Sequence, residues 1–401
     1  MRKLVFFILS VLLSACVRDA LFPGTPRFSH ENSRPEHRAD TTEVVPQGPH
    51  VYLTAVRFPD GFAWEEDTCA VDGAVWIDLY RDGRLVRSIP AGASIHADMH
   101  RFRNGHLYTD YSSGEETILC QDGVELFRFQ GREAIRGFLV REDGICTLGQ
   151  DRDGNGISCR MDGRAVFRSE SGTVYGDPCS PGRAAGALTE EGDWLFYAYG
   201  VNADGGTEYN IMRNGDLYRS FPKGSGGTVM DIRVIREKVY RIQVQGRVTV
   251  LQSDDGASTL PLLGRETLVW GRIVPMNDDV LVLGAVTSRE GDRRCFLYSQ
   301  KGSTYPVGEK DEISELLTDG NLVGWLTVDS DGWPERLNRS DGKGRDLPKD
   351  VRLISGHCLL LHEGRAYLAL TGRNGASNRL WVDGEETEIP FNGYFTSVTV
   401  E

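Results

Sequence analysis

The sequence lacks the motifs by which most enzymes are recognised. G-x-S-x-G, H-E-x-x-H, a P-loop and a complete G-x-G-x-x-G are all absent, which removes support for hydrolase, zinc-protease, NTPase and dinucleotide-binding chemistry. No C-x-x-C occurs, so a thioredoxin-like or zinc-ribbon site is not expected. The chain has 45 basic and 58 acidic residues, a net charge of −13, and no basic cluster in the sequence. Nucleic acid is therefore not an expected partner.

Long apolar runs are also missing, except for a short one at the N-terminus. Arg2 and Lys3 precede the apolar residues 4–13, a run too short to span a bilayer, which requires about 20 residues. This pattern predicts a cleaved signal peptide over residues 1–16. The tetrapeptide Leu13-Ser14-Ala15-Cys16 resembles the bacterial lipobox, which implies that Cys16 is acylated, with palmitate among such chains, and anchors the protein in the membrane. An ordinary secretory signal with an incidental cysteine is the alternative.

Residues 17–49 are predicted to form a flexible tether. Five prolines stand there among Ser, Glu, Arg and His, with almost no periodic apolar pattern. In enteric bacteria, an aspartate directly after the lipobox cysteine is typical of lipoproteins retained in the inner membrane. The corresponding position here is Val17. This favours a lipoprotein of the cell envelope at the outer membrane, on either its periplasmic or its surface side.

The remaining chain, residues 50–401, is organised by a recurring two-residue turn. Short β-type runs are interrupted by Asp82-Gly83, Asp122-Gly123, Asp162-Gly163, Asn214-Gly215, Asp255-Gly256, Lys301-Gly302, Asp341-Gly342 and Asp383-Gly384. The glycines are 40, 40, 52, 41, 46, 40 and 42 residues apart. This is the period of a four-stranded propeller blade. The sequence therefore predicts an all-β, eight-bladed β-propeller in a single domain.

Strand assignments within the repeats follow the same plan. The third unit shows it with predicted strands at 134–140, 145–149, 157–161 and 164–169, and the eighth with 352–361, 366–370, 379–382 and 386–389. The first unit lacks its innermost strand, whereas the chain continues past the last unit with residues 394–400. This tail is expected to pair with the N-terminal blade at residues 51–56 and to close the ring.

Two segments show the repeat best: Tyr209-Asn210-Ile211-Met212-Arg213-Asn214-Gly215 and Leu380-Trp381-Val382-Asp383-Gly384. With the lipobox, they make the chain resemble the propeller lipoproteins of Gram-negative bacteria. The resemblance covers residues 50–401, concerns architecture and implies no activity. Neither a Gly-His…Trp-Asp signature nor the Ser-x-Asp-x-Gly box of sialidase-like propellers occurs.

The predicted turns divide the propeller into two faces. Tight two-residue turns gather on one face, and the longer connections at 59–73, 170–186, 200–206 and 288–292 gather on the opposite face, which we call the long-loop face. Binding residues usually lie on such loops above a rigid scaffold. Aromatic side chains expected to be exposed there are Trp64, Tyr175 and Trp333, and these could stack on sugar rings or on a partner's apolar side chains.

Two polar clusters are candidate metal sites. Asp151, Asp153 and Asn155 match the opening of a calcium loop, although the later acidic ligand is missing and a metal-free turn is the alternative. His96, Asp98 and His100 alternate along the predicted inner strand of blade two, and His357 holds the position equivalent to Asp98 in blade eight. These four side chains are expected to face the channel, either as transition-metal ligands or as polar lining.

Seven cysteines follow Cys16, an odd number that leaves at least one thiol unpaired. Cys146 and Cys159 are equidistant from the loop around Arg152-Asp153. In a regular hairpin they would face each other at disulfide distance. Two interpretations stay open: a Cys146–Cys159 disulfide, or two small buried residues.

These observations favour a membrane-anchored binding or scaffolding lipoprotein that presents its long-loop face to a protein or glycan partner. The alternative is a carbohydrate-active propeller enzyme, a glycosidase or lyase, with its site at the channel mouth. Two carboxylates, or a histidine with a carboxylate, converging in one pocket would favour the enzyme.

Overall fold

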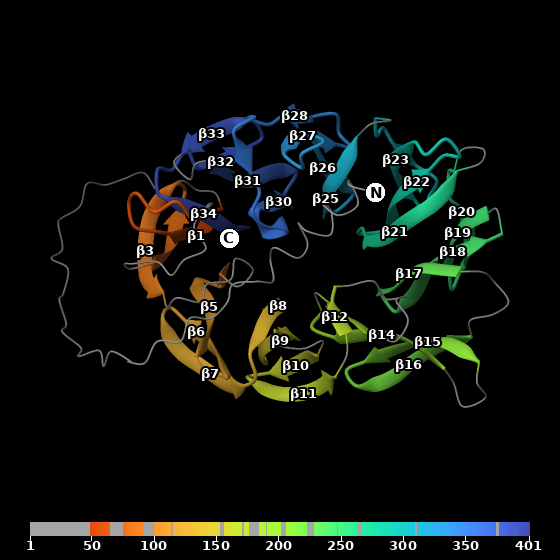
Figure 1. The fold of residues 1–401 in the computed structure, drawn as a ribbon, viewed down its shortest axis with the longest axis horizontal. Coiled ribbons are helices and arrows are strands. Elements are labelled where there is room, and N and C mark those ends of the chain that lie inside the picture. Colours follow the sequence, from red (N-terminus) through yellow and green to blue (C-terminus); the bar gives the residue numbers. More distant parts are fainter. Residues whose placement is uncertain are drawn as a thin grey trace.

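The structure, a computed structural model, describes residues 49–401 except 65–74, 92–99, 114, 153–155, 171, 176–183, 190, 202–205, 223–227, 247, 263–265, 309–310 and 374–376. The described strands form eight sheets, antiparallel except for one strand pair in blade four, arranged as blades around a central channel (Figure 1). This confirms the predicted eight-bladed β-propeller. No helix among the described residues has both the length and the apolar character needed to cross a bilayer.

The strands of each blade run outward from the channel in the following order. Blade one contains β34 (Gly393–Val400), β1 (Val51–Arg57), β2 (Val75–Arg81) and β3 (Arg84–Ala91). Blade two contains β4 (Arg101–Arg103), β5 (His106–Ser113), β6 (Glu116–Gln121) and β7 (Val124–Gln130). Blade three contains β8 (Glu133–Arg141), β9 (Gly144–Asp151), β10 (Ile157–Met161) and β11 (Arg164–Ser169). Blade four contains β12 (Gly172–Val174), β13 (Ala184–Leu188), β14 (Trp194–Val201), β15 (Thr207–Arg213) and β16 (Asp216–Pro222).

The second half of the ring repeats this order. Blade five contains β17 (Thr228–Ile235), β18 (Lys238–Gln245), β19 (Val248–Ser253) and β20 (Gly256–Thr259). Blade six contains β21 (Thr267–Pro275), β22 (Val280–Thr287), β23 (Arg293–Ser299) and β24 (Thr304–Tyr305). Blade seven contains β25 (Glu312–Asp319), β26 (Leu322–Val328), β27 (Pro334–Arg339) and β28 (Arg345–Asp346). Blade eight contains β29 (Val351–Arg352), β30 (Leu359–His362), β31 (Arg365–Gly372), β32 (Arg379–Val382) and β33 (Glu385–Glu388).

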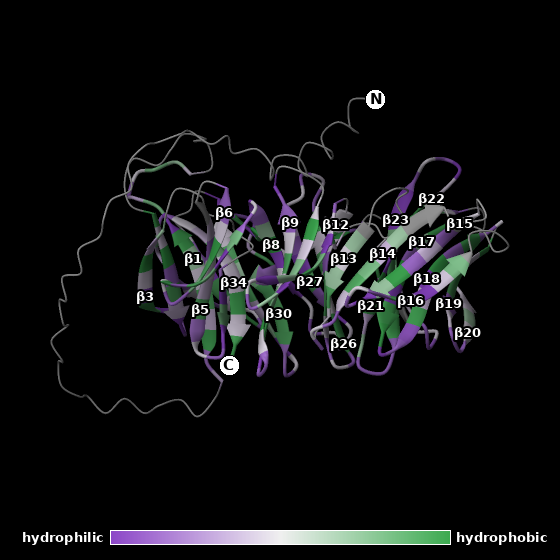
Figure 2. Cartoon of the chain, turned by 90° about the horizontal axis from the view of Figure 1, so that it is seen from below, coloured by the Kyte–Doolittle hydropathy of each residue, from purple (hydrophilic) through white to green (hydrophobic). Residues whose placement is uncertain are grey.

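The ring is closed by the C-terminal strand, as predicted. β34 is the innermost strand of blade one and pairs antiparallel with β1, from Val51 opposite Val400 to Arg57 opposite Gly393. Phe395 is fully buried in the core between blades eight and one. Figure 2 shows the strands running between the two faces of the disc, with the C-terminus on one of them. Glu401 accepts hydrogen bonds from the backbone N–H groups of Asn104 and Gly105, so this is the face of the tight turns.

Two structural requirements explain why the first residue of most of these turns is Asp or Asn. Asp122 and Gly123 have φ of 53° and 82°, both left-handed, as a two-residue hairpin turn requires. Asp122 Oδ1 also accepts a hydrogen bond from the backbone N–H of Leu107, at 3.0 Å, at the start of the blade's second strand. Asp82, Asp162, Asn214 and Asp383 make the same bond in their own blades. Asx therefore tolerates the backbone conformation and ties the turn to a neighbouring strand.

The glycine of several turns is also an inter-blade contact. A Cβ at Gly163 would lie 2.8 Å from Phe127 Cβ of blade two, and one at Gly123 would lie 3.3 Å from Ile89 of blade one. The same contact occurs where the ring closes between blades eight and one: a Cβ at Gly83 would lie 3.2 Å from Thr387 of blade eight. The outer strand of one blade thus packs on the turn glycine of the next.

Replacing Gly163 with alanine is expected to lower the free energy of unfolding by about 2–4 kcal/mol. The left-handed φ of 75° accounts for roughly 1–2 kcal/mol, and the clash with Phe127 accounts for the rest. The matched control is Gly105→Ala, at a φ of 77° with no atom within 4 Å of the new Cβ, which should lose only about 1–2 kcal/mol. Urea unfolding of both variants measures the difference, and equal losses would contradict the inter-blade contact.

Two inner edges depart from the predicted strands. The predicted strand 352–361 of blade eight is wrong as a continuous strand: β29 and β30 pair with opposite ends of β31, and the 3-10 helix η2 (Gly356–Cys358) separates them. The segment bends because Ser355 Oγ donates a hydrogen bond to the backbone oxygen of Thr396 on β34. In blade four, the predicted loop 170–186 contains β12, an extra inner strand that runs parallel to β13.

Candidate functional site

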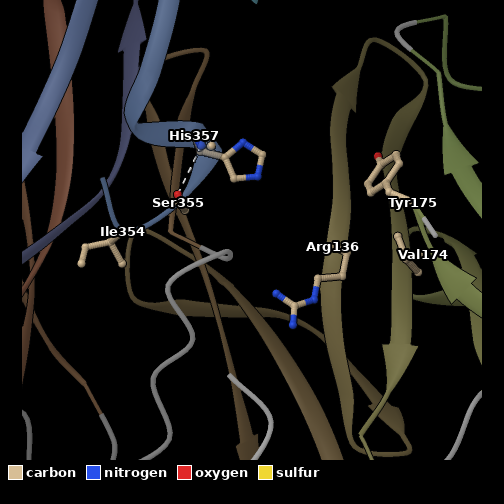
Figure 3. Close-up of a pocket in the computed structure, with 7 residues that line it drawn as sticks. Arg136, Val174, Tyr175, Ile354, Ser355 and His357 are labelled. Carbon is tan, nitrogen blue, oxygen red and sulfur yellow. Dashed lines mark hydrogen bonds between the residues drawn. The ribbon is translucent and has the colours of Figure 1, made fainter. Parts of the chain in front are cut away.

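A pocket of about 400 Å³ lies in the central channel between blades three, four and eight. Its lining residues come from β8, from β12 and the residue after it, and from the segment around η2: Arg136, Val174, Tyr175, Ile354, Ser355, Gly356 and His357. Figure 3 shows the side chains of Arg136 and His357 extending toward each other from opposite walls. The predicted residues Tyr175 and His357 thus line one pocket, and no sequence pattern indicated that they lie together.

The backbone of Tyr175 is held in an unusual conformation. Its φ is 52°, whereas the other described non-glycine residues with positive φ all lie in tight hairpin turns. The backbone N–H of Tyr175 donates a hydrogen bond of 2.7 Å to the carbonyl oxygen of Gly186 on β13. The residue as a whole is 49% exposed. Backbone strain of this kind costs roughly 1–3 kcal/mol and concentrates at functional sites.

The same side of the channel gathers three arginines. Arg136 lies on β8, and Arg101 and Arg103 lie on β4, two residues apart. Burial and the charge of Arg103 lower the pKa of Arg101 to about 10, and burial lowers the pKa of Arg136. All three guanidinium groups still carry a full charge at neutral pH. These arginines bring positive charge to this side of the channel, although the whole chain is acidic.

The pKa of His357 reflects the desolvation and the charge at this place in the channel. Desolvation within the ring, followed by the charges of Arg101, Arg103 and Arg136, lowers its pKa to about 3. His357 is exposed, and its imidazole points into the open channel (Figure 3). It is consequently neutral at any physiological pH and can donate a hydrogen bond or accept one without carrying charge.

One buried acid lies behind this cluster. Asp110 on β5 is 2% exposed, and burial raises its pKa to about 7 against the opposing charges of Arg152 and Arg101. The carboxyl group is therefore partly protonated at neutral pH. It therefore offsets the arginine charges only in part.

The predicted histidine cluster is only partly described. His96 and Asp98 lie outside the described residues, and His100 precedes β4 instead of lying within an inner strand. His100 is fully buried, and its carbonyl oxygen accepts hydrogen bonds from Thr54 Oγ1 and Ser397 Oγ. His357 lies in η2 and not on a regular strand, and its equivalence to Asp98 stays a prediction because Asp98 lies outside the described residues. Across the described part of the chain, no group of three His, Cys, Asp or Glu side chains is placed to hold a metal ion.

The calcium loop stays a prediction, because Asp153 and Asn155 lie outside the described residues. Asp151 ends β9, and its carboxylate lies 3.9 Å from Arg168 Nη2. Its backbone N–H donates to the carbonyl oxygen of Gly156, which closes the hairpin loop.

The two predicted tryptophans are less available than their loops suggested. Trp64 is half-buried, lies 4.9 Å from the ring of Tyr394, and carries the guanidinium of Arg352 over its face at 4.7 Å. Trp333 is also half-buried and is covered by the guanidinium of Arg373 at 4.0 Å. Both rings pack against the propeller, and their role in binding stays a prediction.

The predicted Cys146–Cys159 disulfide is wrong in this structure. Cys146 pairs with Met161, and Cys159 pairs with Leu148, so the two cysteines are offset by two residues. Both thiols are free and buried in the core between blades three and four. Burial raises the pKa of each thiol, which keeps both protonated.

No protein-family model matches the sequence, and no curated protein matches it significantly. Solved structures with similar folds share little sequence. BamB from Moraxella catarrhalis is 12% identical over 75% of this chain and 89% of its own, with a TM-score of 0.42. A eukaryotic initiation factor is 10% identical over 88% of this chain and 99% of its own, with a TM-score of 0.46. Dihydro-heme d1 dehydrogenase NirN is 12% identical over 92% and 77%, also at 0.46. Similarity at this level carries no argument about function.

Proposed function

We propose that this protein is a lipid-anchored binding or scaffolding protein of the cell envelope, which engages a protein or glycan partner through its long-loop face and channel mouth. The observation that carries the proposal is the make-up of the channel pocket. The seven described residues that line it include no carboxylate, and the pKa of the histidine among them is about 3, so it is a weak base near neutral pH. These described residues thus supply neither the acid pair of a glycosidase nor a general base, and this favours binding over catalysis.

The anchor is tested with Cys16→Ser. The acyl groups supply stable membrane attachment, so the variant should move from the membrane fraction to the soluble fraction and lose incorporation of labelled palmitate. Ser14→Ala keeps a small residue in the lipobox-like motif and should behave as the parent. Retention of Cys16→Ser in the membrane would contradict the anchor without affecting the binding face.

The binding face is tested by photo-crosslinking in native cells. Arg289 and Asp331 lie in exposed loops of the long-loop face, whereas Asn104 and Glu363 lie in exposed tight turns of the opposite face. A photoreactive amino acid at each position should yield partner adducts from Arg289 or Asp331 only. Adducts that arise only from Asn104 or Glu363 would assign binding to the opposite face and overturn the proposal.

A further inference from the structure

The outer rim of the propeller carries exposed large apolar side chains on only half of the ring. They lie on the outermost strands of blades one to four, and among the described residues none lies on the outermost strands of blades five to eight. We call this set the apolar band: Leu85, Val86, Val124, Leu126, Val166 and Leu217. We propose that the apolar band contacts the surface of the lipid bilayer. The inference relies on the lipid anchor proposed above and adds the orientation of the ring on the membrane.

The apolar band follows a repeated feature of the fold. In β3, β7, β11 and β16, the strand pairing skips the residue three positions after the turn glycine, which makes a β-bulge. The skipped residues are Val86, Leu126, Val166 and Tyr218. The described outer strand pairs of blades five to eight continue without such a shift. Figure 1 shows the four bulged strands on consecutive outer edges of the ring.

The bulges limit which kind of partner can cover the band. β3, β7, β11 and β16 contain 8, 7, 6 and 7 residues, which is long enough for a partner strand to add at the edge. A bulge interrupts the row of backbone groups and twists the edge, so it opposes such pairing. The side chains stay available instead, and Val124 is 68% exposed. An apolar medium that contacts side chains therefore fits this band better than an added β-strand does.

The chain enters the ring beside the apolar band. His50 Nδ1 lies 2.6 Å from Asp82 Oδ2, and the backbone N–H of Val51 donates to Asp82 Oδ1 at 2.9 Å. Asp82 belongs to the turn that leads into β3, so residue 50 lies at the tight-turn face next to the start of the band. The proposed anchor at Cys16 precedes residue 50 by 34 positions, which span at most about 120 Å. The anchor therefore keeps this edge of the ring within reach of the membrane.

The charges of the rim favour the same orientation. The outermost strands of blades one to four carry mostly arginines: Arg84, Arg87, Arg128, Arg164, Arg168 and Arg219, against Glu125 and Asp216. Those of blades five to eight carry mostly acids: Asp346, Glu385, Glu386 and Glu388, against Arg345. Several arginines of the first half are paired with acids, as Arg219 is with Asp254, so the apolar side chains supply most of the attraction. An anionic leaflet repels the acidic half and leaves the band toward the membrane.

This orientation leaves the long-loop face open. Every residue of the band lies within three positions of a turn glycine, so the band follows the edge of the disc at the tight-turn face. The long-loop face then points away from the bilayer, where a partner can reach it. Because a flat bilayer touches only part of a curved rim, blades two and three, in the middle of the band, make the main contact.

The contact is tested by photo-crosslinking in native cells whose phospholipids carry radioactive phosphate. A photoreactive amino acid takes the place of Val124 or Val166 in the band, or of Val248, a valine of similar exposure at the start of β19 on the long-loop face. We expect at least fivefold more lipid adduct from each band position than from position 248. Adducts to protein alone, or as much lipid adduct from position 248 as from the band, would overturn the proposal.

A pair of matched variants tests whether the apolar side chains hold the contact. With the photoreactive amino acid at position 126, Val124→Asp/Val166→Asp should lower the yield of lipid adduct at least fivefold. The control Val248→Asp/Val269→Asp adds the same charge at two exposed valines outside the band and should keep the parental yield. Thermal unfolding confirms that each ring is intact, and Val124→Ser/Val166→Ser replaces the first variant if the aspartates prevent folding. Equal losses in the band variant and the control would contradict the contact.

The anchor and the band can fail separately. If Cys16→Ser stays in the membrane fraction, the anchor is wrong, whereas lipid adducts from Val124 and Val166 still support the bilayer contact. If Cys16→Ser leaves the membrane but the parent gives no lipid adduct from these two positions, the anchor stands and the contact of the apolar band is overturned.

Discussion

A chain that ends at residue 392 is expected not to form the folded ring. Without β34, blade one loses its innermost strand, and β1 exposes an unpaired edge together with Leu53 and Ala55. Phe395 and Val398 are 0% and 6% exposed, and each contributes about 1.5–3 kcal/mol by its burial. Added to the lost ladder of backbone hydrogen bonds, this approaches the whole stability of a typical domain, about 5–15 kcal/mol. The truncated chain should show no cooperative thermal transition by near-UV circular dichroism.

The control for this truncation is Glu401→Ala. It keeps the β1–β34 ladder and removes only the hydrogen bonds that Glu401 makes to the Asn104-Gly105 turn. Its unfolding midpoint should stay within a few degrees of the parent's. A synthetic peptide of residues 390–401, added to the truncated chain, should restore the transition. A truncated chain that melts at the parental temperature would show that the ring does not depend on this strand.

The architecture was predictable because its determinants are local. In five of the eight turns the Asx-Gly pair fixes the hairpin by its left-handed backbone conformation, and the spacing of all eight pairs indicates the number of strands between them. Ring closure was predictable because the first blade lacks one strand in the sequence and the C-terminal tail supplies one. These features need no knowledge of how blades pack against one another.

The pocket could not be predicted, because it joins three blades. Arg101 and Arg103 alternate on β4, which is a recognisable signal for two side chains on one face, but nothing in the sequence places Arg136 beside them. The turn at His357 depends on Ser355 bonding to Thr396, two residues from different blades. The extra strand that ends before Tyr175 pairs in parallel, a contact that the hairpin repeat does not contain.

The predicted Cys146–Cys159 disulfide was wrong because the position of the hairpin loop was misjudged by one residue. It placed the centre of the β9–β10 loop at Arg152-Asp153, whereas the hairpin closes between Asp151 and Gly156. The centre therefore lies one residue later, and this moves the partner of Cys146 from Cys159 to Met161. Register is sensitive to loop conformation at the level of a single residue.

The second large effect concerns the ion pair buried in blade three. Arg160 Nη2 lies 2.6 Å from Glu133 Oε1, with the side chains 8% and 3% exposed, and the guanidinium lies 4.1 Å from the centre of the Phe129 ring. Glu133 is held against Gly149, where an added Cβ would clash with Oε2 of the carboxylate. The carboxylate therefore has little room to move toward solvent if its partner is removed.

Arg160→Met should lower the free energy of unfolding by about 3–5 kcal/mol, because it leaves the Glu133 carboxylate buried without its cation. The double variant Glu133→Gln/Arg160→Met removes both charges with little change of shape and should recover most of this loss. Urea unfolding of the parent, both single variants and the double variant gives the coupling energy. Arg128→Met, which removes an exposed arginine bonded to Glu116 and Glu125, is the surface control and should change stability far less. If the losses in free energy of unfolding of the two single variants add up to the loss of the double variant, the two charges contribute independently to stability. That result would contradict the coupling of the buried pair.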